Sequence, residues 1–296
     1  MTNGNQHDAN AGGTVAIGAA RNFWQRVASA AVLVPAALAC TYIGGWLFLV
    51  VCAIAAAAIL WEWTSLVLRS ADVKILAPGL IALLAAAGLA GASEPGAAVA
   101  MIAVGAVLAG GLIAASPNLD PGPTTAAWAG GGVVYAGVAL LSPVLLRNDA
   151  ALGLSALLFL FAIVWATDIL AYLVGRAVGG PLLWPRLSPN KTWSGAFGGL
   201  FGGVAAGILV AYASAGIKPA VAGILALVLS IVAQSGDLFE SAVKRRFGAK
   251  DAGHLIPGHG GVMDRLDGFL VAALVAVLIG VLRQGMAAPA RGLLVW

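Results

Sequence analysis

The sequence carries very little charge for its length. Of its 296 residues, 9% are charged and 61% are hydrophobic, and the mean hydropathy is +0.97. Soluble domains usually carry about a quarter charged residues, so this composition excludes a single water-soluble globule. Cysteine and histidine are also scarce, with two and three residues. No spacing among them is typical of a disulfide framework or a zinc site, and we interpret Cys40 and Cys52 as small buried hydrophobes.

Apolar runs close to 20 residues long recur along the whole chain. Runs of this length match the thickness of a bilayer, so they predict an all-α polytopic membrane protein of about nine spans. Two longer loops are expected, at 175–194 and 237–267. The predicted spans are roughly 26–43, 46–67, 75–92, 97–115, 126–146, 151–174, 195–215, 219–236 and 268–284.

The chain divides into three parts by composition. Residues 1–20 are polar, glycine-rich and without periodicity, which predicts a disordered tail rather than a signal peptide. Residues 21–150 form an N-terminal membrane region of about five spans. Residues 151–296 form a C-terminal membrane region that contains most of the polar motifs.

The distribution of lysine and arginine predicts the orientation. With nine spans and a cytosolic N-terminus, twelve basic residues fall on the cytosolic side and four on the far side. This bias is the positive-inside pattern, and it places both long loops in the cytosol. The cytosolic residues are Arg21, Arg26, Arg69, Lys74, Arg176, Arg186, Lys191, Lys244, Arg245, Arg246, Lys250 and Arg265; the far-side residues are Arg147, Lys218, Arg283 and Arg291.

The second long loop gathers charge and glycine. In KRRFGAKDAGHLIPGHGGVMDRLDG, residues 244–268, five cations and three aspartates stand among six glycines. Cations and a glycine-rich backbone suit phosphate oxygens, and carboxylates suit a magnesium ion that bridges to phosphates. The loop therefore predicts a site for a polyphosphate with magnesium. Contact with anionic lipid headgroups is the alternative for the cations alone.

Acids recur at helical spacing at both ends of this loop. If the eighth span continues as a helix beyond Asp237, then Ser241 and Lys244 share its face, with Glu240 beside them. The two aspartates of MDRLDG are three residues apart and share a face where the ninth span begins. Two helix ends are thus expected to bring aspartates to one membrane surface. Contact with anionic lipid would explain the cations but not the acids that recur among them at helical spacing.

Two further carboxylates lie within predicted spans. Asp168, in WATDILAY, lies deep in the sixth span, where a carboxylate costs about 2.5–3.5 kcal/mol on insertion scales and is a functional candidate. We expect it to face the polar cavity, with Lys191 or Arg176 as its partner; a structural hydrogen bond between helices is the alternative. Glu62, in LWEWTS, is nearer the interface, where we expect a structural or snorkelling role.

The stretch SAVKRRFGAKDAGHLIPGHGGVMDRLD, residues 241–267, resembles the signature of the phosphatidate cytidylyltransferases, or CDP-diacylglycerol synthases. That signature reads S-x-φ-K-R-x4-K-D-x-small-x2-φ-P-x-H-G-G-φ-x-D-R-φ-D, where φ is apolar, and every fixed position matches. A looser likeness covers TDILAYLVGRAVGG (167–180) and SPNKTWSGAFGG (188–199). The family often has Glu or Gln where this chain has Ser194, so no side-chain role is carried over to that position.

The resemblance implies a magnesium-dependent enzyme of phospholipid synthesis. Such an enzyme transfers CMP from CTP to phosphatidate and gives CDP-diacylglycerol and pyrophosphate. The resemblance also implies a multi-pass protein of a bacterial-type inner membrane, with its active site facing the cytosol in the 151–296 region, and it is compatible with a homodimer. Nucleic acid is not an expected partner.

The resemblance also implies roles for individual residues. The expected catalytic residues are Asp237, Asp264, Lys244, Arg245 and Ser241. The expected ligands of magnesium, alone or with a second cation, are Asp237, Asp264 and Asp267. The expected substrate-binding residues are Ser188, Lys191, Thr192, Lys250, His259, Gly260, Gly261, Arg265 and Asp168.

Two other functions fit parts of the pattern. A CTP-dependent lipid kinase of the polyprenol or phytol type would transfer only the γ-phosphoryl group and release CDP. An ion-coupled transporter would use Asp168 and the clustered charges, but most of the charge lies in one loop and no paired broken helices are evident. A G-x-x-x-x-G-K-[ST] loop is absent, which disfavours an ATP-driven pump.

Overall fold

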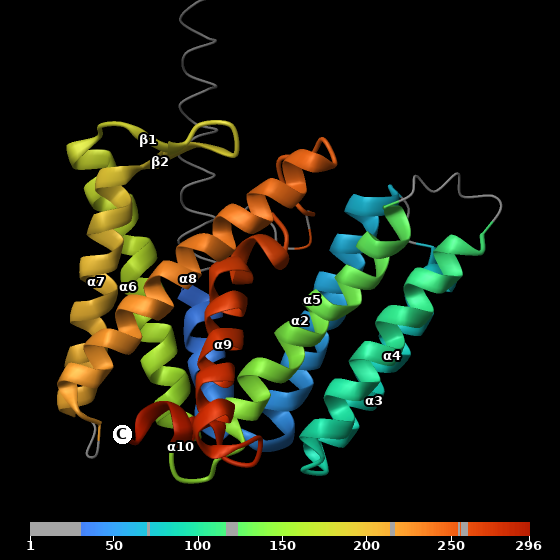
Figure 1. The fold of residues 1–296 in the computed structure, drawn as a ribbon, viewed down its shortest axis with the longest axis horizontal. Helices are drawn as coiled ribbons and strands as arrows, with labels where there is room; N and C mark the ends of the chain where they lie inside the picture. The colour runs from blue at the N-terminus through green and yellow to red at the C-terminus, as the bar shows by residue number, and fades with distance from the viewer. Residues whose placement is uncertain (1–30, 70–71, 117–123, 214–216, 254, 256–259) are drawn as a thin grey trace, which may run out of the picture.

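The computed structural model describes residues 31–69, 72–116, 124–213, 217–253, 255 and 260–296. Long helices run side by side as a bundle, with a small β-hairpin at one end (Figure 1). Within the described residues, eight helices are long and apolar enough to cross a membrane, which confirms an all-α polytopic membrane protein. They are α2 (Gly45–Leu68), α3 (Val73–Gly91), α4 (Pro95–Ala114), α5 (Thr125–Arg147), α6 (Gly153–Val178), α7 (Trp193–Ala213), α8 (Pro219–Arg246) and α9 (Met263–Gln284).

These helices correspond to the second through ninth predicted spans. The first predicted span, 26–43, is described only over Ala31–Ile43, a shorter apolar helix; its beginning lies outside the described residues. Arg147 ties this helix to the bundle, because its guanidinium donates to the backbone carbonyls of Thr41, at 2.6 Å, and Tyr42, at 3.0 Å. The predicted tail, 1–20, also lies outside the described residues.

The two predicted long loops are shorter than expected. In the first, α6 continues to Val178, and β1 (Leu182–Trp184) then pairs antiparallel with β2 (Ser188–Thr192). In the second, α8 continues as a helix to Arg246 and α9 already begins at Met263. The continuation of α8 past Asp237 agrees with the helical spacing of the acids there. The extension of α6 and the hairpin were not predicted, because neither carries a long apolar run. A short helix, α10 (Pro289–Leu294), follows α9.

Glycines on α7 let it pack closely against α6. A Cβ atom at Gly195 would lie 2.7 Å from the carbonyl oxygen of Ala171, and one at Gly199 would lie 2.9 Å from that of Thr167. Small residues at such positions allow membrane helices to approach at backbone distance. Figure 1 shows α6 and α7 as neighbours beneath the β-hairpin, which connects them.

The charged residues separate to the two ends of the bundle as predicted. The ends of α2, α6 and α8 and the starts of α3, α7 and α9 lie at one end, which we call the hairpin end (Figure 1). Positive charge favours the cytosolic side, and the cytosolic orientation of this end stays a prediction. Described cations at the hairpin end are Arg69, Lys74, Arg176, Arg186, Lys191, Lys244, Arg245, Arg246, Lys250 and Arg265; those at the opposite end are Arg147, Lys218, Arg283 and Arg291.

A topology experiment tests this arrangement. A reporter inserted at Arg186, in the turn between β1 and β2, is expected in the cytosol, and one fused after Trp296 is expected outside. Green fluorescent protein and alkaline phosphatase, which are active on opposite sides of a bacterial inner membrane, provide the measurement. Three spans, α7, α8 and α9, separate the two insertion points, so reporters on the same side would contradict this arrangement.

Candidate active site

Helices α8 and α9 approach each other closely at a pair of glycines. A Cβ atom at Gly236 would lie 3.1 Å from the Cα atom of Gly268 and 2.8 Å from the carbonyl oxygen of Asp267. A Cβ atom at Gly268 would lie 3.0 Å from Oδ1 of Asp237. Any larger residue at either position would push the helices apart. The glycines therefore allow the aspartates beside them, Asp237 and Asp267, to meet.

Four carboxylates gather around this crossing, and we call Asp237, Glu240, Asp264 and Asp267 the acidic cluster. Asp267 lies close enough to Asp237 and to Glu240 for their charges to repel, and the same holds for Glu240 and Asp264. Both carboxylate oxygens of Glu240 are buried and accept no hydrogen bond within the described residues. Aspartates from two helix ends thus meet at one end of the bundle, as the helical spacing predicted.

Two lysines form ion pairs with the acidic cluster. Lys191, from β2, lies 2.7 Å from Oδ2 of Asp237. Lys244, one turn beyond Glu240 on α8, lies 2.6 Å from Oδ1 of Asp264 and 3.2 Å from Oε1 of Glu240. When all six side chains are ionised, the four carboxylates and the two ammonium groups carry two negative charges in excess. Because the pairs are partly buried, water screens this excess less than it would at an exposed surface.

The acidic cluster fits a magnesium ion that takes part of its coordination from substrate. Among the described residues, no group of three or more His, Cys, Asp or Glu side chains could hold a metal ion by itself. Magnesium, however, is usually bound through one or two carboxylates together with water and substrate phosphates. Glu240 forms an ion pair with Lys244, but its buried oxygens accept no hydrogen bond within the described residues. A divalent cation would satisfy these oxygens and the excess negative charge.

Asp264, one of the predicted ligands, organises the signature loop. Its Oδ2 accepts the backbone N–H of Gly261 at 2.9 Å and that of Ala252 at 3.1 Å, while its Oδ1 faces Lys244. Gly260 adopts a φ of 85°, and a Cβ atom there would lie 3.1 Å from Oδ2 of Asp264, so glycine is required on both counts. The carboxylate of Asp264 thus joins Ala252 to Gly261, two described residues of the signature segment.

A carboxylate from the N-terminal half reaches the same loop. Glu62, on α2, is fully buried, and its two oxygens accept the backbone N–H groups of Val262 and Met263, each at 2.8 Å. The expected structural role is confirmed, whereas snorkelling to the interface is wrong. The sequence signal was an acid between two tryptophans in an apolar span, but nothing in it indicated the partner.

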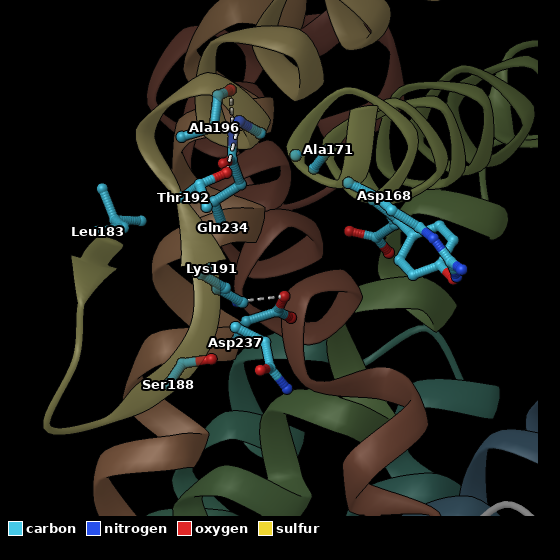
Figure 2. Close-up of a pocket in the computed structure, with 14 residues that line it drawn as sticks. Asp168, Ala171, Leu183, Ser188, Lys191, Thr192, Ala196, Gln234 and Asp237 are labelled. Carbon is cyan, nitrogen blue, oxygen red and sulfur yellow. Dashed lines mark hydrogen bonds and ion pairs between the residues drawn. The ribbon is translucent and has the colours of Figure 1, made fainter. Parts of the chain in front are cut away.

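A cavity of about 660 Å³ opens between α6, β2, α7 and α8, and we call it the α6–α7 cavity. Figure 2 shows Asp168 facing it from α6 and Lys191 reaching from β2 to Asp237. Asp168 therefore faces the cavity as predicted, but Lys191 bonds to Asp237 rather than to Asp168. The other lining residues are Ala171, Tyr172, Gly175, Arg176, Leu183, Ser188, Asn190, Thr192, Gly195, Ala196 and Gln234.

A smaller cavity of about 250 Å³ lies on the other side of β2, and we call it the cationic cavity. Lys244, Arg245 and Lys250 line it, together with Ser241. Strand β2 is the wall between the two cavities, because Ser188 and Asn190 line both. The remaining lining residues of the cationic cavity are Leu187, Pro189 and Asp251.

Some of the other predicted site residues line a cavity, and others do not. Thr192 lines the α6–α7 cavity, but its hydroxyl also accepts the N–H of Gly195 at 3.1 Å in the first turn of α7. Ser194 donates to the carbonyl of Gly179, so its role is to close the base of the hairpin. Arg265 lies in the first turn of α9, outside both cavities. His259 lies outside the described residues.

Comparison with known proteins identifies the family. Residues 24–282 match the model of the cytidylyltransferase family. The chain belongs to this family. It is similar to the phosphatidate cytidylyltransferases of Brucella abortus (strain 2308) and Brucella suis biovar 1 (strain 1330), at 44% identity over 88% of this chain and 93% of each relative. That of Staphylococcus haemolyticus is 34% identical over 50% of this chain and 56% of the relative.

The predicted resemblance to phosphatidate cytidylyltransferases is therefore confirmed, and this cytidylyltransferase is an enzyme, a nucleotidyltransferase. Its site is suited to that chemistry. A nucleotidyl transfer brings two phosphate-bearing groups together, so catalysis depends on positioning them and neutralising their charge. Two adjoining cavities have cations in their linings, and the acidic cluster lies beside β2, which borders both.

Replacement of Asp237 tests the site. Asp237→Asn removes the charge that holds Lys191 and one carboxylate of the acidic cluster, so we expect cytidylyltransferase activity to fall by about 100-fold or more while the protein still inserts. Asp149→Asn is the matched control, since Asp149 lies at the opposite end and its side chain accepts the N–H groups of Ala151 and Leu152, which asparagine also does. Full activity of purified Asp237→Asn protein would refute the assignment.

Proposed function

We propose that this enzyme transfers CMP from CTP to phosphatidate and forms CDP-diacylglycerol and pyrophosphate. One observation carries the proposal: two cavities with cationic linings share β2 as a wall, beside the Lys191–Asp237 ion pair and the acidic cluster. Two anions can therefore be bound separately with their reacting groups close together. The names of the relatives, which match over 93% of their length, support these substrates.

The cationic cavity suits the triphosphate of CTP. Lys244, Arg245 and Lys250 line it, and the Arg245 guanidinium can donate two parallel hydrogen bonds to phosphate oxygens. Ser241 adds a hydroxyl donor to the same surface. The small volume, about 250 Å³, fits a phosphate chain whose nucleoside extends toward the opening at the hairpin end.

The α6–α7 cavity suits the phosphatidate headgroup. Arg176 and Lys191 can bind the phosphate, while Ala171 and Leu183 offer apolar surface to the glycerol and the first acyl carbons. The outer faces of α6 and α7 expose large hydrophobic side chains, so acyl chains in the bilayer can lie against the same helices. Those side chains are Ile169, Leu173, Phe197 and Phe201.

In the proposed reaction, an oxygen of the phosphatidate phosphate attacks the α-phosphorus of CTP. A new P–O bond forms, the bond between the α-phosphorus and the bridging oxygen breaks, and pyrophosphate leaves with the bonding electrons. Lys244 and Arg245 stabilise the charge on the leaving group, and Lys191 stabilises the attacking phosphate. The acidic cluster would hold magnesium, alone or with a second cation, and the bound metal would supply positive charge to the reacting phosphates.

We further propose that the hairpin end faces the cytosol of a bacterial cell, where CTP is available. The positive charge at this end and the bacterial sources of the relatives support that orientation in a cell membrane. A homodimer stays a prediction.

Analysis of the products tests the reaction. Purified enzyme with phosphatidate, magnesium and CTP radiolabelled at its α-phosphorus is expected to place the label in CDP-diacylglycerol and to release pyrophosphate in equal amount. Chelation of magnesium with EDTA should stop the reaction, and added magnesium should restore it. Label from the γ-phosphorus in the lipid, with release of CDP, would overturn the proposal in favour of a lipid kinase. Uptake into sealed vesicles without CTP turnover would favour a transporter.

A pair of matched substitutions tests the assignment of the two cavities. Arg176→Gln removes a cation from the α6–α7 cavity, so we expect KM for phosphatidate to rise about tenfold while KM for CTP changes little. Lys250→Gln removes a cation from the cationic cavity and should have the converse effect. Steady-state kinetics in mixed micelles, with each substrate varied in turn, provide the measurement. The reverse pattern would exchange the two assignments.

A further inference from the structure

Helix α9 begins without a capping side chain of its own. Its N-cap residue, Val262, makes no side-chain capping hydrogen bond. The first N–H groups of a helix have no partner within the helix, and together with the helix dipole they favour a negative group. Glu62 supplies that group from α2, 200 positions earlier, because its oxygens accept the N–H groups of Val262 and Met263.

The signature loop is built to enclose the Glu62 carboxylate. A Cβ atom at Gly253 would lie 2.9 Å from Oε1 of Glu62, and one at Gly261 would lie 2.7 Å from Oε2. These are closer than real Cβ contacts, so only glycine at both positions leaves room for the carboxylate. Glu62 is fully buried and is therefore shielded from substrate and from water.

The neighbour of Glu62 anchors the end of α2 to α5. The indole N–H of Trp63 donates to the backbone carbonyl of Trp128 at 2.8 Å, and the Trp63 ring lies 5.1 Å from that of Tyr135. A Cβ atom at Gly132 would collide with the Trp63 ring, so α5 offers a fitted surface for the indole. The Glu62 side chain thus extends from a part of α2 that is anchored to α5.

One short segment connects Glu62 to the acidic cluster. The N–H of Gly261 is held by Asp264, and the next two N–H groups, of Val262 and Met263, are held by Glu62. We infer that Glu62 is a positioning residue: by capping α9 it fixes the direction in which that helix starts, and with it the places of Asp264 and Asp267. This inference rests on the proposed function of the acidic cluster.

Glu62→Gln tests the inference. Glutamine has the same shape but only one acceptor oxygen, so its NH₂ group must face one of the two backbone N–H groups. In hydrogen exchange measured by mass spectrometry without substrates, we expect faster exchange in the peptide that contains Val262 and Met263. We also expect kcat per folded enzyme to fall about tenfold, with KM for CTP and for phosphatidate within about twofold of the parent. A merely structural role would reduce the yield of folded enzyme but not its kcat.

Two further variants complete the experiment. Glu94→Gln is the matched control, because Glu94 is exposed at the start of α4 and makes no side-chain cap there; its kcat and exchange should be unchanged. Gly253→Ala leaves Glu62 in place but crowds its Oε1, so it should lower kcat in the same way.

Wild-type kcat in folded Glu62→Gln protein would overturn the inference. If that variant does not fold, wild-type kcat and exchange in Gly253→Ala would overturn it instead. The failure of the proposed function is distinguishable, because it would show as a parent enzyme that makes no CDP-diacylglycerol, whereas the exchange measurement tests the cap in either case.

Discussion

The close crossing of α8 and α9 is the constraint on which the site depends. Gly236 and Gly268 bring the backbones together, so the adjacent Asp237 and Asp267 must share one small volume with Glu240 and Asp264. Four carboxylates so close repel one another strongly in a partly buried environment. Two lysines offset part of that repulsion, and the proposed magnesium ion would offset the remainder.

The acidic cluster lies at the hairpin end of the bundle, beside both cavities. Strand β2 lies at the hairpin end, and the helices beneath it expose apolar faces. The cationic cavity, with Lys244 and Arg245 of α8, is the proposed site of the polyphosphate, and the cavity between α6 and α7 is the proposed site of the lipid headgroup. A soluble anion and a membrane-bound one can therefore meet without either crossing the bilayer.

The N-terminal half supports chemistry that takes place in the C-terminal half. The signature residues all lie on α8, on α9 and in the segment between them, yet α9 is capped from α2, and α2 is anchored on α5 by Trp63. Since a buried carboxylate is costly in an apolar bundle, its retention at Glu62 is understandable when it satisfies two backbone donors that otherwise have no partner. Helices α2 and α5 thus supply the contacts that fix the start of α9.

Span lengths, helical spacing and the local signature were sufficient to predict the membrane bundle, the extension of α8 past Asp237 and the meeting of aspartates from two helices. These features depend on neighbours within a few residues or on hydrophobic length, both of which are visible along the chain. The ion pair of Lys191 with Asp237, the hairpin and the partner of Glu62 were not predictable in this way. The ion pair and the contact of Glu62 join residues 46 and 200 positions apart, and only the packing of the helices decides which polar groups then come within hydrogen-bonding distance.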